Sequence, residues 1–234
     1  MSTPNFRFKQ FTIWHDKCAM KVGTDGVLLG AWCPTTNPLT THPLTRILDV
    51  GTGSGLIARM LMQRCPEAEV EGIDIDEAAV EQARENGVRA FCFSLQEWQE
   101  SYDLIVSNPP YFQNSLKNPD KGRQTARHTD TLSYEELIRH SARLLTDHGQ
   151  LALILPAEAE TEVRGLAAAE RLSLTHVTRV YSKETKPARR VLLCFAKGIS
   201  GLEVSGLVED TLILEDEIGG RSAAYSKLCQ EFYL

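Results

Sequence analysis

The chain has 234 residues, of which 42% are hydrophobic and 24% are charged, and its formal net charge is −6. These proportions are typical of a globular protein and exclude disordered and disulfide-scaffold classes. No apolar run approaches the ~18–20 residues that cross a membrane, and the N-terminus lacks the apolar stretch of a signal peptide. We therefore expect a cytoplasmic protein with no membrane partner, and nothing in the sequence indicates an obligate protein partner.

The six cysteines lie apart and form no CxxC or other metal-ligand spacing. In a cytoplasmic chain, such cysteines are typically reduced and mostly buried thiols rather than disulfides or zinc ligands. The sequence therefore predicts no metal site.

Short apolar runs alternate with helical periodicity from residue 46 onward. The runs predict strands over residues 46–50, 70–74, 89–93, 102–107 and 150–155. Helical spacing predicts helices after residue 55, from an N-cap at Asp76 to Asn86-Gly87, over 133–146 and over 158–170. Strands separated by helices indicate βαβ units and a parallel sheet.

The end of this region departs from the alternation. The runs 172–181 and 190–197 are separated only by SKETKPAR, which is too short for a crossover helix, so they should pair antiparallel. The prediction is an α/β fold with a mostly parallel seven-stranded sheet and an antiparallel edge hairpin. A strand near 211–214 and a helix near 222–232 complete a single domain, with an N-terminal segment 1–33, a core 46–198 and a C-terminal extension 199–234.

A glycine-rich turn follows the first predicted strand. The sequence Asp49-Val50-Gly51-Thr52-Gly53-Ser54-Gly55 has G-x-G-x-G spacing, which differs from the dinucleotide G-x-G-x-x-G. Asp74 closes the second strand, where a carboxylate can accept hydrogen bonds from both ribose hydroxyls. Together they predict a nucleoside cofactor, although an ordinary turn and a helix-capping aspartate are the alternatives.

The motif Asn108-Pro109-Pro110-Tyr111 follows the strand at 102–107. An asparagine side chain and a proline carbonyl can both accept hydrogen bonds from one planar NH2 group, and proline has no N–H of its own. Two acceptors favour the pyramidal nitrogen whose lone pair attacks an electrophile, and Tyr111 can stack on a flat ring. The alternative is a Pro-Pro turn with a buried tyrosine.

These motifs resemble those of a known family. DVGTGSG, the strand-end Asp74 and NPPY are similar to the class I S-adenosylmethionine-dependent methyltransferases of the N6-adenine type, which have a Rossmann-like fold. FTIWHDKCAMKVGTDGVLLGAW and RQTARH extend the resemblance to the tRNA (adenine-N6)-methyltransferases of valine tRNA. It covers nearly the whole chain, from Phe6 to EFYL. The implied activity is methylation of N6 of the adenine 3′ to the anticodon, with S-adenosylhomocysteine as the other product and tRNA as the partner.

The resemblance also implies roles for individual residues. Asn108, Pro109, Pro110 and Tyr111 would hold the target adenine. The cofactor-binding residues would be Lys21, Thr24, Asp49, Gly51, Gly53, Gly55, Asp74, Ile75, Ser94 and Asn108. Lys21 and Thr24 would cover the carboxylate side of the cofactor, and Asp74 its ribose. Ser94 departs from the family pattern, in which an acid often binds the adenine amino group of the cofactor.

Two predicted loops carry a local excess of positive charge. Residues 117–128 and 183–190 each contain four lysines and arginines against one acid, whereas residues 203–234 contain seven acids against two. The candidate phosphate contacts are Lys117, Lys121, Arg123, Arg127, His128, Lys183, Lys186, Arg189 and Arg190. An ordinary solvated loop is the alternative for both segments. Phe6, Phe8, Phe11 and Trp14 are predicted to be core.

Other functions stay open from the residues alone. A glutamine amide offers NPPY the same planar NH2 group, so an N5-glutamine methyltransferase acting on protein is one alternative. A non-catalytic RNA- or nucleotide-binding module of the same fold is another. DNA adenine methylation is disfavoured because no added DNA-reading domain is evident. The spacing of the glycines disfavours a dehydrogenase.

Overall fold

The computed structural model describes residues 4–36, 42–110, 132–198 and 206–234. The strands are β1 (Asn5–Arg7), β2 (Thr12–Trp14), β3 (Arg46–Val50), β4 (Glu69–Asp74), β5 (Arg89–Cys92), β6 (Tyr102–Ser107), β7 (Leu145–Pro156), β8 (Leu172–Tyr181), β9 (Ala188–Lys197) and β10 (Val208–Ile213). The helices are α1 (Thr24–Trp32), α2 (Leu56–Arg64), α3 (Glu77–Glu85), α4 (Tyr134–Leu144), the 3₁₀ turn η1 (Ala157–Ala159), α5 (Glu160–Ala169) and α6 (Ala223–Leu228). None of the helices in these parts of the chain has the length and apolar character that crossing a bilayer requires.

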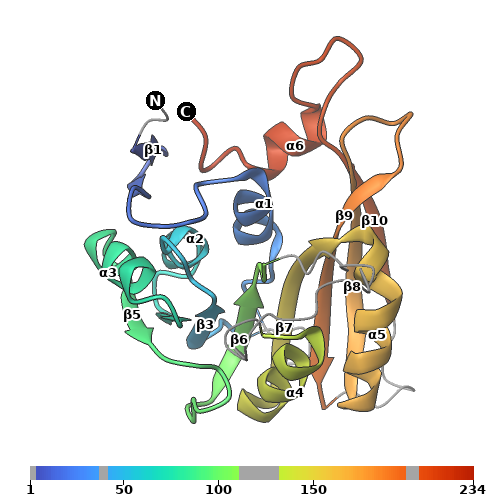
Figure 1. The fold of residues 1–234 in the computed structure, drawn as a ribbon. Coiled ribbons are helices and arrows are strands. Elements are labelled where there is room, and N and C mark those ends of the chain that lie inside the picture. The colour runs from blue at the N-terminus through green and yellow to red at the C-terminus, as the bar shows by residue number, and fades with distance from the viewer. Residues whose placement is uncertain (1–3, 37–41, 111–131, 199–205) are drawn as a thin grey trace, which may run out of the picture.

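Eight strands form one sheet in the order β10-β8-β9-β7-β6-β3-β4-β5 (Figure 1). Every neighbouring pair is parallel except the two pairs that contain β9. The mostly parallel α/β class is therefore confirmed, as is the antiparallel pairing of β8 with β9.

The sheet differs from the predicted one at its end. β10 adds an eighth strand parallel to β8, so the hairpin is not at the edge. Side chains hold this strand, because Arg179 of β8 bonds Glu209 at 3.1 Å and His176 bonds Asp210 at 2.8 Å. These contacts join residues about thirty positions apart, and a local sequence pattern does not reveal them.

Strand residues alternate between two hydrophobic layers, one on each face of the sheet. Ile47, Val106 and Ile154 pack into one layer with α1 and α2, whereas their neighbours Leu48 and Ile105 pack into the other with α4 and α5. Figure 1 shows α4 and α5 together on the near side. Both faces being covered explains why these strands are continuous apolar runs.

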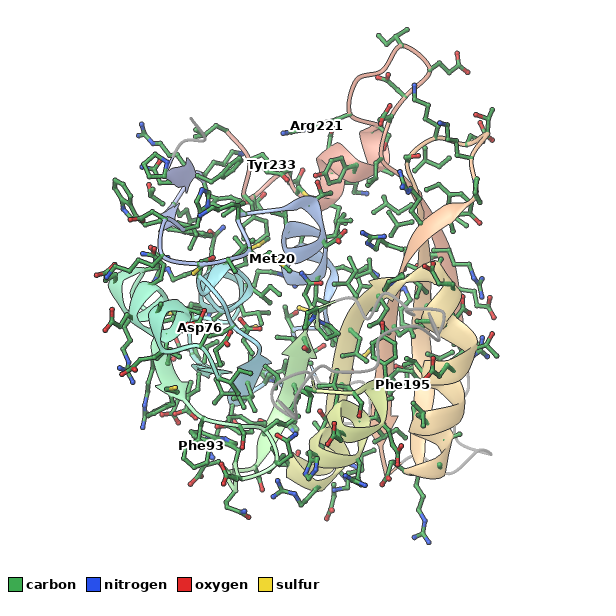
Figure 2. All side chains as sticks on the ribbon, viewed as in Figure 1. Met20, Asp76, Phe93, Phe195, Arg221 and Tyr233 are labelled. Atoms are coloured by element: carbon green, nitrogen blue, oxygen red, sulfur yellow. The ribbon has the colours of Figure 1, made fainter. Side chains whose placement is uncertain are left out.

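The N-terminal strands β1 and β2 lie beside the last residues of the chain (Figure 1). The backbone N–H of Lys9 donates to the carbonyl of Phe232 at 2.9 Å, and Arg221 lies 4.0 Å from the ring centre of Tyr233, which Figure 2 labels near the N-terminal strands. Phe8 is buried as predicted, but Phe6 and Trp14 are 36% and 46% exposed. Because side chains alternate along β2, the buried Ile13 forces Trp14 outward.

Candidate active site

A cleft of about 1480 Å³ opens where β3, β4, β5 and β6 end. Parallel strands present their carboxyl ends at one edge, which is where open α/β sheets bind ligands. Met20, Asp76 and Phe93, labelled in Figure 2, line it from the N-terminal segment, the loop after β4 and the loop after β5. The volume exceeds the ~300–1,000 Å³ of a typical single-ligand pocket.

The glycine turn forms one wall of this cleft. Gly51, Gly53 and Gly55 have φ angles of 70°, 53° and 78°, which non-glycine residues rarely adopt. A Cβ on Gly55 would lie 2.7 Å from Val88, so the turn packs tightly against the chain behind it. On Gly51, a Cβ would meet nothing within 4 Å, so the backbone there is open to a ligand.

Asp74 ends β4 and lines the cleft. Its Oδ2 accepts a hydrogen bond from the Gly53 N–H at 2.9 Å, and its Oδ1 accepts one from the Asp76 N–H at 3.0 Å. A carboxylate has about four acceptor sites, so two remain for a ligand. Asp74 thus joins the glycine turn to the next helix while still facing the cleft.

Asp49 lies beneath the glycine turn rather than on the cleft wall. Its side chain is fully buried, and its Oδ2 accepts hydrogen bonds from Thr52 Oγ1 at 2.8 Å and the Ala58 N–H at 3.2 Å. Its Oδ1 has no partner among the described residues. Burial raises the pKa of Asp49 to about 7, against the lowering effect of these two hydrogen bonds. Through its hydrogen bonds to Thr52 and Ala58, the carboxyl group stabilises the glycine turn from the side away from the cleft.

Asn108, Pro109 and Pro110 form the opposite wall, directly after β6. Ser107 fixes this end of the strand, because its Oγ donates to the Val50 carbonyl at 2.8 Å. The Oδ1 of Asn108 is buried and accepts no hydrogen bond from any described residue. A buried unpaired acceptor is costly, which is the state expected of a group that binds a ligand donor. Tyr111 lies outside the described residues.

Lys21 and Thr24, the two residues of the N-terminal segment that were predicted to bind the cofactor, lie on the cleft wall. Lys21 Nζ donates to the carbonyls of His15 at 2.7 Å and Cys18 at 3.1 Å, which closes this segment on itself. An ammonium group has three donors, so one remains. Sequence reasoning did not foresee this structural use of the lysine.

Ile75, Phe93 and Ser94 also line the cleft, and the first two are large apolar side chains left 54% and 42% exposed. Ser94 Oγ donates to Glu97 Oε2 at 2.8 Å, and Glu97 is a lining residue. A carboxylate is therefore present although position 94 itself is a serine. Sequence analysis missed Glu97, and its position three residues after Ser94 was the available signal.

The predicted RNA contacts have different surroundings. Lys183 pairs with Glu215 at 3.3 Å, and Arg190 Nε donates to Asp25 at 2.9 Å, whereas Lys186 and Arg189 are exposed. Lys117, Lys121, Arg123, Arg127 and His128 lie outside the described residues. Among the residues described, no three His, Cys, Asp or Glu side chains cluster as metal ligands.

Fold and cleft together define an α/β methyltransferase. The family model "Methyltransferase small domain" matches residues 36–169, more than half of the chain. A solved structure described as a predicted O-methyltransferase from Agrobacterium tumefaciens superposes with a TM-score of 0.66. It is 18% identical and is matched over 89% of this chain and 96% of its own, which supports the fold alone.

Curated relatives narrow the class. Two tRNA1(Val) (adenine(37)-N6)-methyltransferases, from Bacteroides fragilis and Parabacteroides distasonis, are 43% and 45% identical over 100% of this chain and 99% of their own. The enzyme of that name from Aeromonas hydrophila is 40% identical over 98% of this chain and 97% of its own. The chain belongs to the tRNA1(Val) (adenine(37)-N6)-methyltransferase family.

Proposed function

We propose that this chain transfers a methyl group from S-adenosylmethionine to N6 of adenine 37 in tRNA1(Val), the adenine 3′ to the anticodon. The observation that carries the proposal is the buried Oδ1 of Asn108, which lies beside Pro109 in the cleft and has no partner among the described residues. The full-length identity to relatives of that name supports the choice of RNA and nucleotide.

The residues of the cleft fit the cofactor. The open backbone at Gly51 and Gly53 suits the methionine part, and Asp74 suits the ribose hydroxyls. Ile75 and Phe93 offer apolar surface to the adenine ring of the cofactor, and Ser94 holds Glu97 as an acceptor for its amino group. Lys21 and Thr24 lie where the N-terminal segment would cover the carboxylate end. When bound, the cofactor supplies an electrophilic methyl group on its sulfonium.

Asn108 and Pro109 would hold the target nitrogen. Asn108 Oδ1 and the Pro109 carbonyl each accept one of the two N6 hydrogens, and proline cannot compete as a donor. This concentrates the nitrogen lone pair toward the methyl group, so direct in-line transfer needs no covalent protein intermediate. Positioning of the two reactants supplies up to ~7–11 kcal/mol of the barrier reduction. Tyr111 would stack on the target base.

The target adenine must leave its stack to enter the cleft, and a single-stranded loop makes this cheapest. Lys186, on the connection between β8 and β9, and Arg189, at the start of β9, are exposed, and they would contact phosphates. Lys183 and Arg190 would do so only in exchange for Glu215 and Asp25. The segment 117–128 would supply the remaining contacts. We place the enzyme in the cytoplasm with its tRNA substrate.

The test is methyl transfer from labelled S-adenosylmethionine to unmodified tRNA1(Val), followed by nucleoside analysis. N6-methyladenosine is the expected product, and a matched transcript with guanine at position 37 should stay unlabelled. Label in both transcripts would contradict the assigned nucleotide. Label in release-factor protein but not in RNA would instead identify a glutamine methyltransferase.

A further inference from the structure

Two side-chain amides on one face of α3 and its C-terminal cap hold the N-terminal segment. Gln82 and Asn86 lie one helical turn apart and are 0% and 8% exposed. Gln82 Oε1 accepts a hydrogen bond from the Lys17 N–H at 3.0 Å. Asn86 Oδ1 accepts one from the Trp14 N–H at 2.9 Å, and its Nδ2 donates to the Trp14 carbonyl at 2.7 Å. The backbone of Trp14 is therefore paired on both of its polar groups.

Asn86 makes one further hydrogen bond, which reaches the glycine turn. Its Nδ2 also donates to the Ser54 carbonyl at 2.8 Å. An amide NH2 has two hydrogens, and here one points to each partner. Gly51–Ser54 line one wall of the cleft, and the segment that follows Trp14 lines another through Cys18, Met20 and Lys21. A single NH2 group thus bridges the two walls.

The segment after Trp14 is closed on itself by hydrogen bonds. Lys21 Nζ bonds the carbonyls of His15 and Cys18, and the Val22 N–H donates to His15 Nδ1 at 3.3 Å. These bonds fix its internal shape but not its distance from the glycine turn. That distance depends on its attachments, and the bonds of Asn86 to Trp14 attach its start.

We propose that Asn86 is a positioning residue that sets the spacing between the N-terminal segment and the glycine turn, and thereby the affinity for S-adenosylmethionine. This inference rests on the proposed function, because it takes the cleft to be the cofactor site. Asn86 is absent from the described cleft lining. Its loss should therefore raise the dissociation constant of the cofactor and leave turnover at saturating cofactor close to wild type.

The direct test replaces Asn86 without changing its size. Asn86→Asp keeps an acceptor for the Trp14 N–H but removes both donors and places a carboxylate oxygen against two carbonyls. Asn86→Ala is the milder second variant, which removes the bonds without adding charge. The readouts are calorimetric titration with S-adenosylmethionine and S-adenosylhomocysteine, and KM and kcat for methyl transfer to tRNA.

Two controls separate positioning from general destabilisation. Gln150→Ala removes another buried amide, whose Nε2 donates to the Thr36 carbonyl at 3.1 Å. Neither residue belongs to the cleft lining. Lys17→Ala removes exposed ion pairs of the same N-terminal segment with Glu85 and Glu81. Circular dichroism and thermal unfolding check that each variant is folded at the temperature of the titration.

Both Asn86 variants should weaken cofactor binding about tenfold or more, because the buried Ser54 carbonyl and the partly buried Trp14 carbonyl lose a donor and the site loses its preorganised spacing. Both controls should bind as wild type does. Wild-type affinity in the folded Asn86 variants, or an equal loss in Gln150→Ala, would overturn the inference while leaving the proposed function intact. Failure of the wild-type protein to bind the cofactor would overturn both.

Discussion

The two walls of the cleft satisfy their polar groups in different ways. On the cofactor wall, formed by the glycine turn with Asp74, both Asp74 oxygens already accept backbone N–H groups. On the base wall, formed by Ser107–Pro110, the buried Asn108 Oδ1 accepts no hydrogen bond within the described part of the chain. Each oxygen of Asp74 thus has a partner without a ligand, whereas Asn108 Oδ1 has none among the described residues.

From this difference we expect Asp74 to contribute to both folding stability and ligand binding, and Asn108 to contribute only to the proposed reaction. Asp74 accepts two backbone hydrogen bonds and is also proposed to bind the cofactor. Replacing it should therefore lower both stability and ligand affinity. Asn108 Oδ1 bears a desolvation cost in the free protein that only a ligand donor can offset. Replacing it should cost activity without costing stability, because this oxygen has no hydrogen bond to lose among the described residues.

The largest effect is expected for Asn108→Ala. It removes one of two acceptors that act on the attacking nitrogen, so kcat should fall about 10²–10³-fold, by analogy with loss of one preorganised hydrogen bond in other active sites. Cofactor affinity and the midpoint of thermal unfolding should not fall. Ser107→Ala is the matched control, since it loses the bond to Val50 and should lose stability with a smaller loss of rate. Equal loss of cofactor binding and activity in Asn108→Ala would erase the contrast between the walls.

Asp74→Ala should show the mixed behaviour of the cofactor wall. Loss of the ribose contacts should raise the cofactor dissociation constant about 10–100-fold, and loss of two backbone hydrogen bonds should cost about 1–3 kcal/mol of stability. Titration calorimetry and chemical denaturation measure the two. Ser222→Ala is the control, because it removes the helix cap that accepts from the Tyr225 N–H, away from the cleft lining, and should lower stability alone. A variant that loses affinity without stability would contradict the double role of Asp74.

Glu97→Gln should have a smaller effect confined to the cofactor. Exchanging a charged acceptor for a neutral amide should weaken S-adenosylmethionine binding about fivefold, with kcat unchanged at saturation. Ser94→Ala, which releases Glu97 from its 2.8 Å hydrogen bond, should produce part of the same loss. Unchanged binding in Glu97→Gln would remove this residue from the cofactor wall.

Charge reversal at Lys186 and Arg189, which do not line the cleft, should affect RNA binding alone. The double change to Glu should weaken tRNA binding and reduce the slope of log affinity against log salt by about one unit per lost phosphate contact. Cofactor titration should be unaffected. A control reversal at Arg171, on the turn before β8, should leave the slope unchanged. An unchanged slope in the double variant would mean that Lys186 and Arg189 do not contact phosphates.

Asp49→Asn should have the smallest effect on turnover and appear instead in the pH dependence of stability. Burial raises the folded-state pKa of Asp49 from 3.8 to about 7, so the folded protein binds this proton more tightly than the unfolded chain. Its contribution to stability is full below pH 3.8 and is lost as pH rises through about 7. Denaturation of wild type and variant from pH 5 to 8 should show a flatter profile in Asp49→Asn. Parallel profiles would contradict the raised pKa.

Local patterns predicted the secondary structure around the glycine turn well. The strand before the glycine turn, the cap at Asp76 and the strand ending in Asp74 depend on neighbours in sequence, and the structure has each of them. The antiparallel pairing of β8 and β9 followed from a connection too short for a helix. The placement of Asn108 in the same cleft followed from the rule that parallel strands end at one edge.

Long-range pairings were beyond the sequence. The bond between Asn86 and Trp14 joins residues 72 positions apart, and that between Arg190 and Asp25 joins residues 165 apart. No local spacing marks such partners. β7 also begins at Leu145, five residues before the predicted strand, because α4 passes into it without a loop. The N-terminal helix α1 was missed because its apolar residues are nearly continuous and show no helical period.

In the proposed reaction, Asn108 Oδ1 accepts a hydrogen bond from the amino group of the target adenine. The most direct measurement is a crystal structure of the protein with S-adenosylhomocysteine and the anticodon stem-loop of tRNA1(Val). We expect a distance of about 2.7–3.2 Å between Asn108 Oδ1 and N6 of adenine 37, which is the range of a hydrogen bond. An adenine bound in the cleft with N6 directed away from Asn108 would contradict it.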